Sequence, residues 1–395
     1  MSIIEEFRMT DKIGIFSFFS GAGFLDLGFE LAGGYKVLFV NEFHKPFMDT
    51  YKYSREKMGI EIPEFGYHLG DVAKYLEADQ VKELKTELKN AKEKCKLVGF
   101  IGGPPCPDFS VGGKNKGREG DNGKLTKTYI DLISKIKPDF FLFENVKGLY
   151  STVKHRVFFE EMKEKLRRSG YCITERLINA LEYGAPQNRE RIILIGFRTS
   201  VLKNYKVKVK NNDVLPGFNW EEHLLYSMEQ IQEFPWPTEN TFENNGVREC
   251  PQGVPRDLTV EYWFQKNNVI SHPNAMNYFQ PRAGLARFQT VAEGDDSKKS
   301  YKRPHRWRYS PTAAYGNNEV HLHPYKERRL SVAEALAIQS LPVEYEVPSE
   351  LTLSDMFKTV GNGVPFLAAK GLANTIHDYV IYLENNKEHE ETNSK

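Results

Sequence analysis

Short apolar runs alternate with longer amphipathic segments through the first half of the chain, and this alternation restricts the possible folds most strongly. The apolar runs are residues 13–19, 36–40, 97–101, 138–143, 172–178 and 191–197. Most of them lack strict apolar–polar alternation, which is typical of strands buried on both faces. Helical spacing of apolar side chains occurs between them, in residues 72–96, 128–137 and 156–169. This order predicts an α/β fold, with a parallel sheet and helices on both of its faces.

The pattern changes at about Thr199. Asn, Pro and Gly then cluster, with few long periodic segments, until helical spacing returns at residues 329–340 and 364–383. Because 395 residues exceed the size at which one hydrophobic core usually stops growing, a second domain is expected. We predict a first domain at 1–198, a smaller loop-rich domain at 199–327, and a segment at 328–395 that returns to the first domain. The end of the chain, residues 385–395, has the composition of a polar, frayed tail.

Composition excludes several classes of protein. The net charge of +1 gives no overall case for binding nucleic acid or membrane, so any basic surface must come from local segregation of charge. The four cysteines form no Cys-x-x-Cys pair and no histidine has zinc-ligand spacing, so neither a disulfide framework nor a metal site is expected. No apolar run approaches the length of a membrane span and no signal peptide is visible, so a cytoplasmic location is predicted.

A cysteine follows the predicted strand 97–101, in the sequence Gly-Gly-Pro-Pro-Cys-Pro-Asp-Phe-Ser at residues 102–110. Ligands and chemistry gather at the carboxyl ends of strands in open α/β sheets, so Cys106 is a candidate nucleophile. Free cysteine is also among the most buried residue types. From this motif alone, a small buried hydrophobe is an equal alternative.

A second polar motif ends the predicted strand 138–143. Glu144 lies 38 residues after Cys106, and two adjacent parallel strands would bring both side chains to the same edge of the sheet. A carboxylate beside a thiol suggests acid–base assistance to a covalent intermediate. The alternative is an ordinary charge at the end of a strand, facing water.

A glycine-rich turn follows the first predicted strand, at residues 20–28. Its glycines do not have the Gly-x-Gly-x-x-Gly spacing that is typical of dinucleotide-binding folds, so the case for a dinucleotide cofactor is weaker. Glu42 closes the second strand, 19 residues after Gly23, where a carboxylate accepts hydrogen bonds from ribose hydroxyls. Asp71 could receive an adenine amino group. These residues predict a cofactor that contains adenosine, and nothing in the pattern requires that cofactor to have a pyrophosphate. The alternative is a structural turn with a solvated Glu42.

Taken together and in order, the motifs resemble those of the DNA cytosine-5 methyltransferases of bacterial type II restriction–modification systems. The resemblance covers nearly the whole chain. Its motifs are Phe19-Ser-Gly-Ala-Gly23, Pro104-Pro-Cys106, Glu144-Asn-Val146, Gln187-x-Arg-x-Arg191, Arg328-Arg-Leu-Ser331 and Gly361-Asn-Gly-Val-Pro365. Three positions depart from the family pattern. Pro107 stands where Gln is usual, Phe24 where Gly is usual, and Ser17 where Asp is frequent. Pro107 stiffens the cysteine loop and removes a donor, which leaves open how that loop closes.

The resemblance implies a Rossmann-like methyltransferase sheet with a target-recognition domain at 199–327, the remaining residues forming the catalytic and cofactor-binding part. It implies S-adenosylmethionine as methyl donor, S-adenosylhomocysteine as product, and a flipped-out cytosine as acceptor. Cys106 would attack C6 of the base and Glu144 would interact with N3, with Arg189 and Arg191 around the ring and the thiol. Phosphate binding or a solvated strand edge is the alternative for the two arginines. The implied cofactor-binding residues are Phe19, Gly21, Ala22, Gly23, Leu25, Glu42, Asp71, Val72, Pro104, Leu125, Asn362 and Val364.

A basic stretch supports DNA recognition. Residues 282–308 hold eight Lys and Arg against three acidic residues, interleaved with Phe288, Tyr301 and Trp307. This pattern is typical of a nucleic-acid footprint, and a solvated charge run is the alternative. Thr312, in a Pro-Thr-Ala sequence that resembles a short family signature, is the favoured base-proximal residue. The predicted DNA-binding residues are Ser110, Gln187, Arg282, Arg287, Arg303, Arg306, Arg308 and Thr312.

The expected partners are double-stranded DNA and, without a stable complex, a restriction endonuclease; a monomer acting on nucleoid DNA is predicted. A transfer RNA cytosine-5 methyltransferase is one rival, but the long insert and the lack of a Cys-Phe-Thr element after the cysteine loop favour DNA. A catalytically silent DNA-binding regulator is a second rival, which the presence of Cys106, Glu144 and the cofactor loop disfavours. An exocyclic-amine methyltransferase would carry an Asp/Asn-Pro-Pro-aromatic loop without this thiol.

Overall fold

The structure is a computed structural model that describes residues 11–105, 121–210, 214–281, 285–313, 315 and 320–393. Seven strands form one sheet in the order β3-β2-β1-β4-β5-β7-β6. Their bounds are β1 Ile13–Phe18, β2 Tyr35–Glu42, β3 Tyr67–Leu69, β4 Leu97–Gly102, β5 Phe140–Val146, β6 Tyr171–Asn179 and β7 Glu190–Arg198. All six predicted strands are confirmed, and among the described residues the sequence missed only the three-residue β3.

The prediction of a parallel sheet is wrong for one strand. β7 runs antiparallel to both of its neighbours, β5 and β6, whereas the other strand pairs are parallel. A parallel neighbour needs a crossover connection of about a dozen residues or more. Only residues 180–189, with the short helix η4 (Ala180–Tyr183), separate β6 from β7. These two strands therefore form a hairpin, which inserts β7 between β5 and β6.

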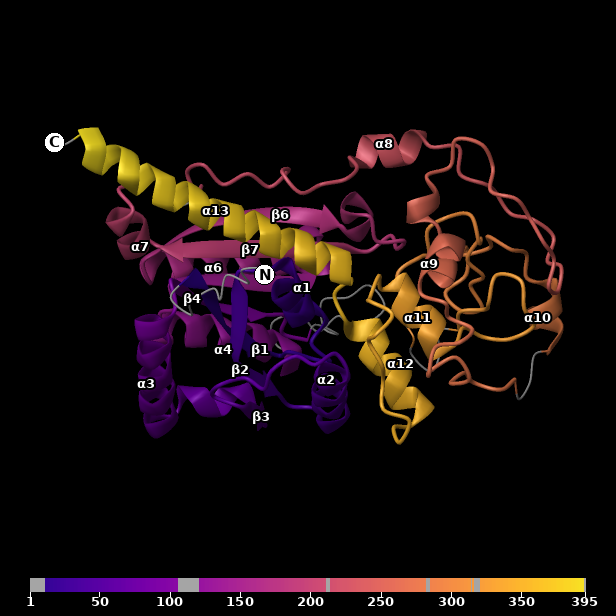
Figure 1. Cartoon of the computed structure of the whole chain (residues 1–395), viewed down its shortest axis with the longest axis horizontal. Helices are drawn as coiled ribbons and strands as arrows, with labels where there is room; N and C mark the ends of the chain where they lie inside the picture. Colours follow the sequence, from indigo (N-terminus) through magenta and orange to yellow (C-terminus); the bar gives the residue numbers. More distant parts are fainter. Residues whose placement is uncertain are drawn as a thin grey trace, which may run out of the picture.

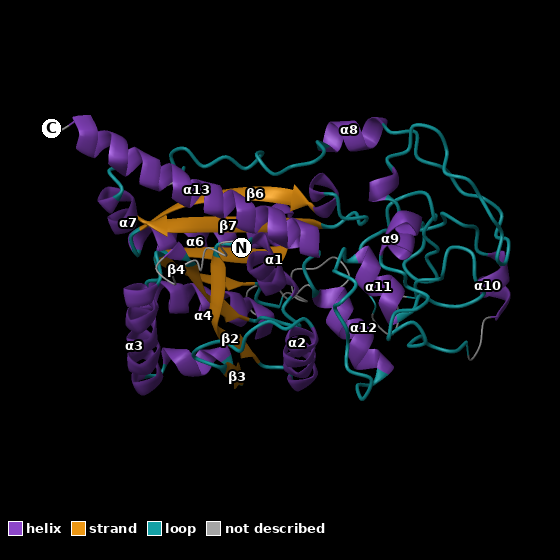
Figure 2. Ribbon diagram, in the orientation of Figure 1, coloured by secondary structure: helices purple, strands orange, loops and turns teal. Residues whose placement is uncertain are grey.

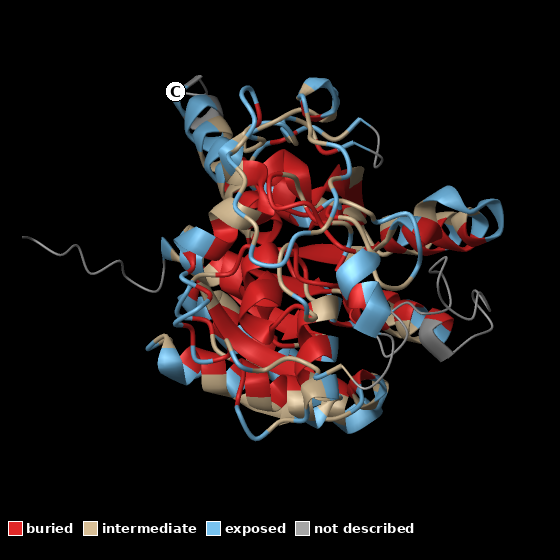
Figure 3. Ribbon diagram, turned by 90° about the vertical axis from the view of Figure 1, so that its right-hand side faces the viewer, coloured by how far each residue is buried: buried red, intermediate tan, exposed pale blue. Residues whose placement is uncertain are grey.

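Helices cover both faces of the sheet, as predicted (Figures 1 and 2). Apolar side chains of α1 (Phe24–Ala32), α2 (Lys45–Lys57) and α13 (Phe366–Asn393) pack in one cluster with the sheet. Side chains of η2 (Val72–Leu76), α3 (Ala78–Lys94), α4 (Asp121–Ile136) and α6 (Val153–Arg168) pack in the other. The short helix α5 (Lys147–Ser151) joins β5 to α6. Buried residues concentrate in these layers, and exposed residues lie on outer helices and loops (Figure 3).

The long helix α13 corrects the prediction of a frayed tail at 385–395. Helix continues to Asn393, so residues 385–393 are helical, and the last two residues lie outside the described part. Leu383 is buried against the core, and the Asn386 side chain donates to the Tyr205 carbonyl at 2.9 Å. The core anchors the preceding turns, which lets a polar sequence continue the helix beyond the body of the protein (Figure 1).

A second lobe contains few regular elements, as its composition predicts. Its helices are α8 (Met228–Glu233), η5 (Arg256–Leu258), α9 (Val260–Lys266) and α10 (Leu285–Thr290), and α11 (Val332–Ile338) and α12 (Leu353–Asn362) lie against it. The lobe begins later than the predicted boundary at 199. The helix α7 (Thr199–Asn204) and the loop residues 205–210 and 214–220 pack with the sheet, where Leu215 is buried and the Trp220 indole donates to Thr174 at 3.0 Å.

Among the residues that the structure describes, no helix is both long enough and apolar enough to cross a membrane.

Candidate active site and nucleic-acid interface

A carboxylate and a guanidinium form an ion pair where β5 ends and β7 begins. Glu144 precedes the last two residues of β5, and Arg191 is the antiparallel partner of Val146. Arg191 Nε lies 2.8 Å from Glu144 Oε1, and the two side chains are 14% and 12% exposed. Partial burial reduces competition from water, so the pair holds the carboxylate in a defined place at this edge of the sheet.

The loop that leads to Cys106 packs directly against this carboxylate. β4 pairs with β5 up to Gly102 and Phe143, so the two strand ends share an edge as predicted. A Cβ atom on Gly103 would lie 2.5 Å from Glu144 Oε2, so any residue other than glycine at position 103 would displace this carboxylate. The Asn145 amide donates to the Pro104 carbonyl at 3.3 Å. Cys106 itself lies outside the described residues, as do Pro107 and Ser110.

Arg189 has a different environment from Arg191. It is buried, and its guanidinium donates to three backbone carbonyls, those of Ala313 at 2.9 Å, Gly361 at 3.1 Å and Asn362 at 3.5 Å. Burial and then the positive charge of Arg191 lower the pKa of Arg189 well below its ordinary value. The expected contact of Arg189 with the base is therefore revised, because its terminal nitrogens hold backbone instead.

The glycine-rich turn and Glu42 form a cradle at the adjacent strand ends. Glu42 accepts from the backbone N–H of Gly21 at 2.8 Å and of His44 at 2.7 Å, and burial raises the pKa of this carboxyl group. Gly21 has φ +56°, and a Cβ atom there would meet nothing within 4 Å. The buried Ser20 hydroxyl has no hydrogen-bond partner. Open space over Gly21, an unused hydroxyl and the remaining lone pairs of Glu42 fit a ligand rich in hydroxyl groups.

The other predicted cofactor residues differ in exposure. Ala22, Gly23, Leu25, Val72, Pro104 and Val364 are buried, Phe19 and Leu125 are half-buried, and Asp71 and Asn362 are exposed. The Asp71 carboxylate accepts from the N–H of Ala73 at 2.8 Å and caps η2. Val72 faces the apolar cluster with α3 and α4, so its side chain is part of the core.

The tertiary structure explains the unusual Phe24. Its ring is buried edge-on to Tyr345, with 5.1 Å between ring centroids. A Cβ atom on Gly363 would lie 2.0 Å from this ring. An early and a late segment of the chain therefore meet here, because Phe24 packs under the turn that holds Asn362 and Val364.

Sequence reasoning missed two residues at the cradle. Phe43, directly after Glu42, has a 71% exposed ring at the end of β2, and an aromatic residue beside that carboxylate was the available signal. Arg55 on α2 is fully buried, donates to the Gly23 carbonyl at 2.6 Å and pairs with Glu30 at 2.9 Å. Burial raises the pKa of Glu30 to about 7. No local pattern indicates Arg55, because its partners are distant in sequence.

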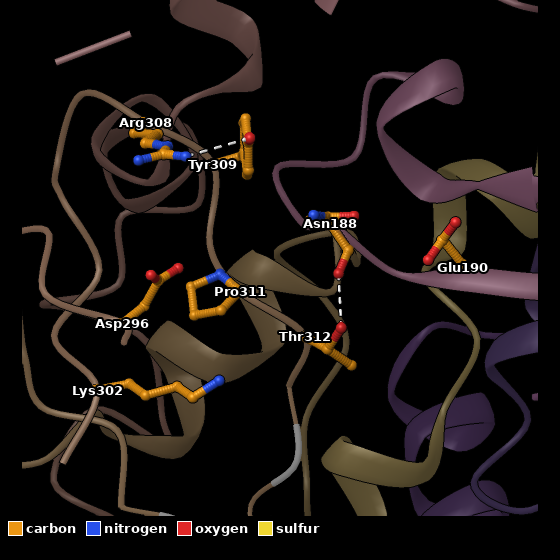
Figure 4. A pocket seen from close by; sticks show the side chains of 8 residues that line it. All are labelled: Asn188, Glu190, Asp296, Lys302, Arg308, Tyr309, Pro311 and Thr312. Carbon is orange, nitrogen blue, oxygen red and sulfur yellow. Dashed lines mark hydrogen bonds between the residues drawn. The ribbon is translucent and has the colours of Figure 1, made fainter. Parts of the chain in front are cut away.

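A cleft lies between the start of β7 and the second lobe (Figure 4). Its volume is about 280 Å³, and it is lined by Asn188, Glu190, Asp296, Lys302, Arg308, Tyr309, Pro311 and Thr312. Thr312 is exposed, and its hydroxyl donates to the Asn188 carbonyl at 2.6 Å. Figure 4 shows Asn188 and Glu190 on one wall, with Lys302 and Arg308 across from them. Acidic and basic side chains and the amide of Asn188 thus line one cleft between the sheet and the second lobe.

Three predicted DNA-contacting residues are instead internal. Arg303 is 0% exposed and donates to the carbonyls of Phe288, Val291 and His323. Arg306 forms a two-pronged pair with the buried Glu293, at 2.7 and 2.9 Å. Gln187 is also buried. The prediction that these three side chains contact DNA is wrong for this structure, because protein groups occupy them away from solvent.

The other basic residues of this stretch that the structure describes reach the surface. Arg287, Lys298 and Lys299 are exposed, and Lys302 and Arg308 are half-buried in the cleft; Arg282 lies outside the described residues. Within the described part of the chain, no group of three or more His, Cys, Asp or Glu side chains is placed to hold a metal ion.

Comparisons with known proteins agree with this arrangement. The family model described as C-5 cytosine-specific DNA methylase matches residues 13–378. The chain is 58% identical to the type II methyltransferase M.NmeDI of Neisseria meningitidis serogroup C, over 96% of this chain and 86% of that protein. It is 29% identical to the type II methyltransferase M.FnuDI of Fusobacterium nucleatum, over 92% and 95% of the two chains.

Solved structures share the fold at low sequence identity. The S. pombe Dnmt2 methyltransferase matches with a TM-score of 0.57 and 12% identity, over 93% of this chain and 99% of that one. The Entamoeba histolytica methyltransferase EhMeth matches with a TM-score of 0.56 and 14% identity, over 93% and 99%. The fold, the family model and the relative with 58% identity lead to one conclusion. The chain belongs to the C-5 cytosine-specific DNA methylases and is a DNA cytosine-5 methyltransferase of the type II restriction–modification class.

Proposed function

We propose that this enzyme methylates C5 of a cytosine flipped out of a specific duplex sequence, through a covalent bond between Cys106 and C6 of the base. The observation that carries the proposal is the Glu144–Arg191 pair, 2.8 Å apart at the sheet edge where the cysteine loop begins. A stacked base is out of reach of groups at such an edge, so the target must leave the duplex.

The chemistry requires a nucleophile at C6, because C5 of an aromatic cytosine reacts poorly with a methyl electrophile. Addition of the Cys106 thiolate forms the C6–S bond and turns C5 into an enamine carbon, while Glu144, protonated when the base is bound, donates its proton to N3 and takes it back when the thiolate leaves. C5 then takes the methyl group. A base removes the C5 proton, its electron pair re-forms the C5–C6 double bond, and the thiolate leaves.

The side chains next to the cysteine loop assist both steps. An ordinary cysteine, with a pKa near 8.5, gives only a small fraction of thiolate at neutral pH. The Arg191 cation at this edge would favour the thiolate, and its pairing with Glu144 at 2.8 Å would keep that side chain in place for the base. Held in place before reaction, such groups stabilise charge as it develops.

When bound, S-adenosylmethionine would supply the methyl group as an electrophile, with S-adenosylhomocysteine as the product. Glu42 would accept from its ribose hydroxyls, and Asp71 from its adenine amino group. Gly21 leaves the backbone open to close approach, and the exposed Phe43 ring offers a flat apolar surface for the adenine. Asn362 and Val364 would close the pocket from the C-terminal segment.

Recognition of DNA would combine two surfaces. The exposed Arg287, Lys298 and Lys299 suit phosphates, whereas Thr312 and Arg308 in the cleft suit base edges. The enzyme would act as a monomer on nucleoid DNA in the cytoplasm. Methylation would protect that DNA from a partner endonuclease, with no stable complex required.

Mechanism-based trapping tests the proposal. A duplex with 5-fluorocytosine at the target should form a denaturation-resistant adduct with the wild-type enzyme only when S-adenosylmethionine is present, and Cys106→Ser should form none. Bisulfite sequencing of DNA from expressing cells identifies the target site beforehand, and transfer RNA serves as the competing substrate. An adduct mapped to Cys95, Cys172 or Cys250, or appreciable turnover by Cys106→Ser, would refute the covalent mechanism.

A further inference from the structure

Two side chains hold the backbone of Ala313 from both sides. The Ala313 N–H donates to Gln187 Oε1 at 3.0 Å, and the Ala313 carbonyl accepts from the Arg189 guanidinium at 2.9 Å. Ala313 directly follows Thr312, whose side chain lies in the cleft (Figure 4). The loop before β7 therefore fixes where Thr312 stands.

The same two side chains also reach the end of α12. The Gln187 amide donates to Gln339 Oε1 at 3.1 Å, and the Gln339 amide donates to the Val360 carbonyl at 2.6 Å. Arg189 donates to the Gly361 carbonyl at 3.1 Å. Two parallel hydrogen-bonded links thus join Ala313 to residues 360–361, next to the turn that contains Asn362.

Backbone hydrogen bonds reinforce this position. Ser310 donates to the Pro186 carbonyl at 2.8 Å, and Asn188 donates to the Ser310 carbonyl at 2.9 Å. Residues 310–313, which we call the recognition segment, are therefore attached to the catalytic sheet rather than only to the second lobe. Because Gln187 and Gln339 are buried, an unpaired amide there would be costly, and each is confined to one arrangement.

We propose that Gln187 and Gln339 are positioning residues for sequence selectivity: through Ala313 they hold Thr312 at a fixed place relative to the target cytosine. This rests on the proposed base-proximal role of Thr312. It assigns Gln187 a function that needs no contact with DNA, in keeping with its burial. Without the link, the recognition segment shifts, and base pairs beside the target are distinguished less well.

The test measures a selectivity ratio, kcat/KM on a duplex with the methylated sequence divided by kcat/KM on a duplex with one base pair changed. This ratio does not depend on the fraction of enzyme that is folded. Gln187→Met and Gln339→Met remove the amide groups at similar side-chain volume. Each should lower the ratio about tenfold, and the double variant should lower it no further, because both remove one link.

Asn274→Leu is the matched control. This amide is equally buried and holds both backbone groups of Val347, at 2.9 Å each, far from Ala313 in sequence. The control should lower Tm and leave the selectivity ratio unchanged. Thr312→Ala tests the underlying role separately: an unchanged ratio there would refute Thr312 as the base-proximal residue, whatever the glutamine variants do.

Three results would overturn the proposal. An unchanged ratio in both glutamine variants, with a Tm loss like that of the control, would make the pair merely structural. A change in Gln187→Met alone would remove Gln339 from the link, and fully additive losses would show that the two residues act independently. If Gln187→Met does not fold, Gln339→Met decides, since it leaves the acceptor for Ala313 in place.

Discussion

Gly103→Ala should impair catalysis while leaving the fold intact. The new Cβ atom would lie 2.5 Å from Glu144 Oε2, so the carboxylate must move by roughly 1 Å to reach ordinary van der Waals separation. The obstructing atom is the end of a flexible side chain, so the displacement is cheap for folding. Displacing a catalytic group by about 1 Å costs roughly 100-fold in rate. We therefore expect kcat to fall about 100-fold, with Tm within a few degrees of wild type.

Single-turnover methylation gives the rate, thermal unfolding gives Tm, and a gel shift gives DNA affinity, which should be unchanged. Gly33→Ala is the control, because Gly33 has φ +83° and its Cβ would meet nothing within 4 Å. Gly33 also has ψ 160°, a backbone region that is essentially confined to glycine and costs another residue roughly 1–3 kcal/mol, so this control should lose stability and keep its kcat. Wild-type kcat in Gly103→Ala would refute the inference that Glu144 needs its observed place beside the cysteine loop.

Three further outcomes follow from buried and exposed charges. Arg55→Met leaves Glu30 without its partner and should lower the free energy of unfolding by about 3–5 kcal/mol. It should also weaken the binding of S-adenosylhomocysteine, measured by calorimetry, because Arg55 holds the Gly23 carbonyl. A stable variant with normal affinity would exclude Arg55 as a support of the cofactor turn. Burial raises the pKa of Glu30 from 4.5 to about 7, so the native state binds the carboxyl proton of Glu30 more tightly than the unfolded state does. The stabilisation that this proton gives is therefore complete below about pH 4.5 and is lost as pH rises through about 7. Urea unfolding at pH 5 and pH 8 should show this loss in wild type and not in Glu30→Gln, and equal pH slopes would contradict the shift. Arg287→Gln should reduce the slope of log DNA affinity against log salt concentration by about 1, because Arg287 is exposed. Arg306→Met should lower stability and leave that slope unchanged, because Arg306 pairs with Glu293 inside the protein. A reduced slope for Arg306→Met would place this guanidinium on DNA.

The linear sequence was sufficient for the features that depend on local periodicity and on short motifs. Buried parallel strands are nearly continuous apolar runs, so six strands could be predicted, and helical spacing predicted most of the covering helices but not α2. The order of elements also predicted that Glu144 and the start of the cysteine loop share an edge, which the pairing of β4 with β5 confirms. Motifs such as that of Cys106 are contiguous in sequence, and the family could be identified from them before any contact was known.

The tertiary structure decided the features that depend on pairing between distant segments. Periodicity shows that residues 190–198 form a strand but not which way it runs, and the hairpin with β6 made β7 antiparallel. Composition shows that residues 282–308 are basic, but not that Arg303 and Arg306 are internal while Arg287 is exposed. A side chain's charge is a local property, whereas its burial depends on partners such as Glu293 and the His323 carbonyl, which only the folded chain brings to it.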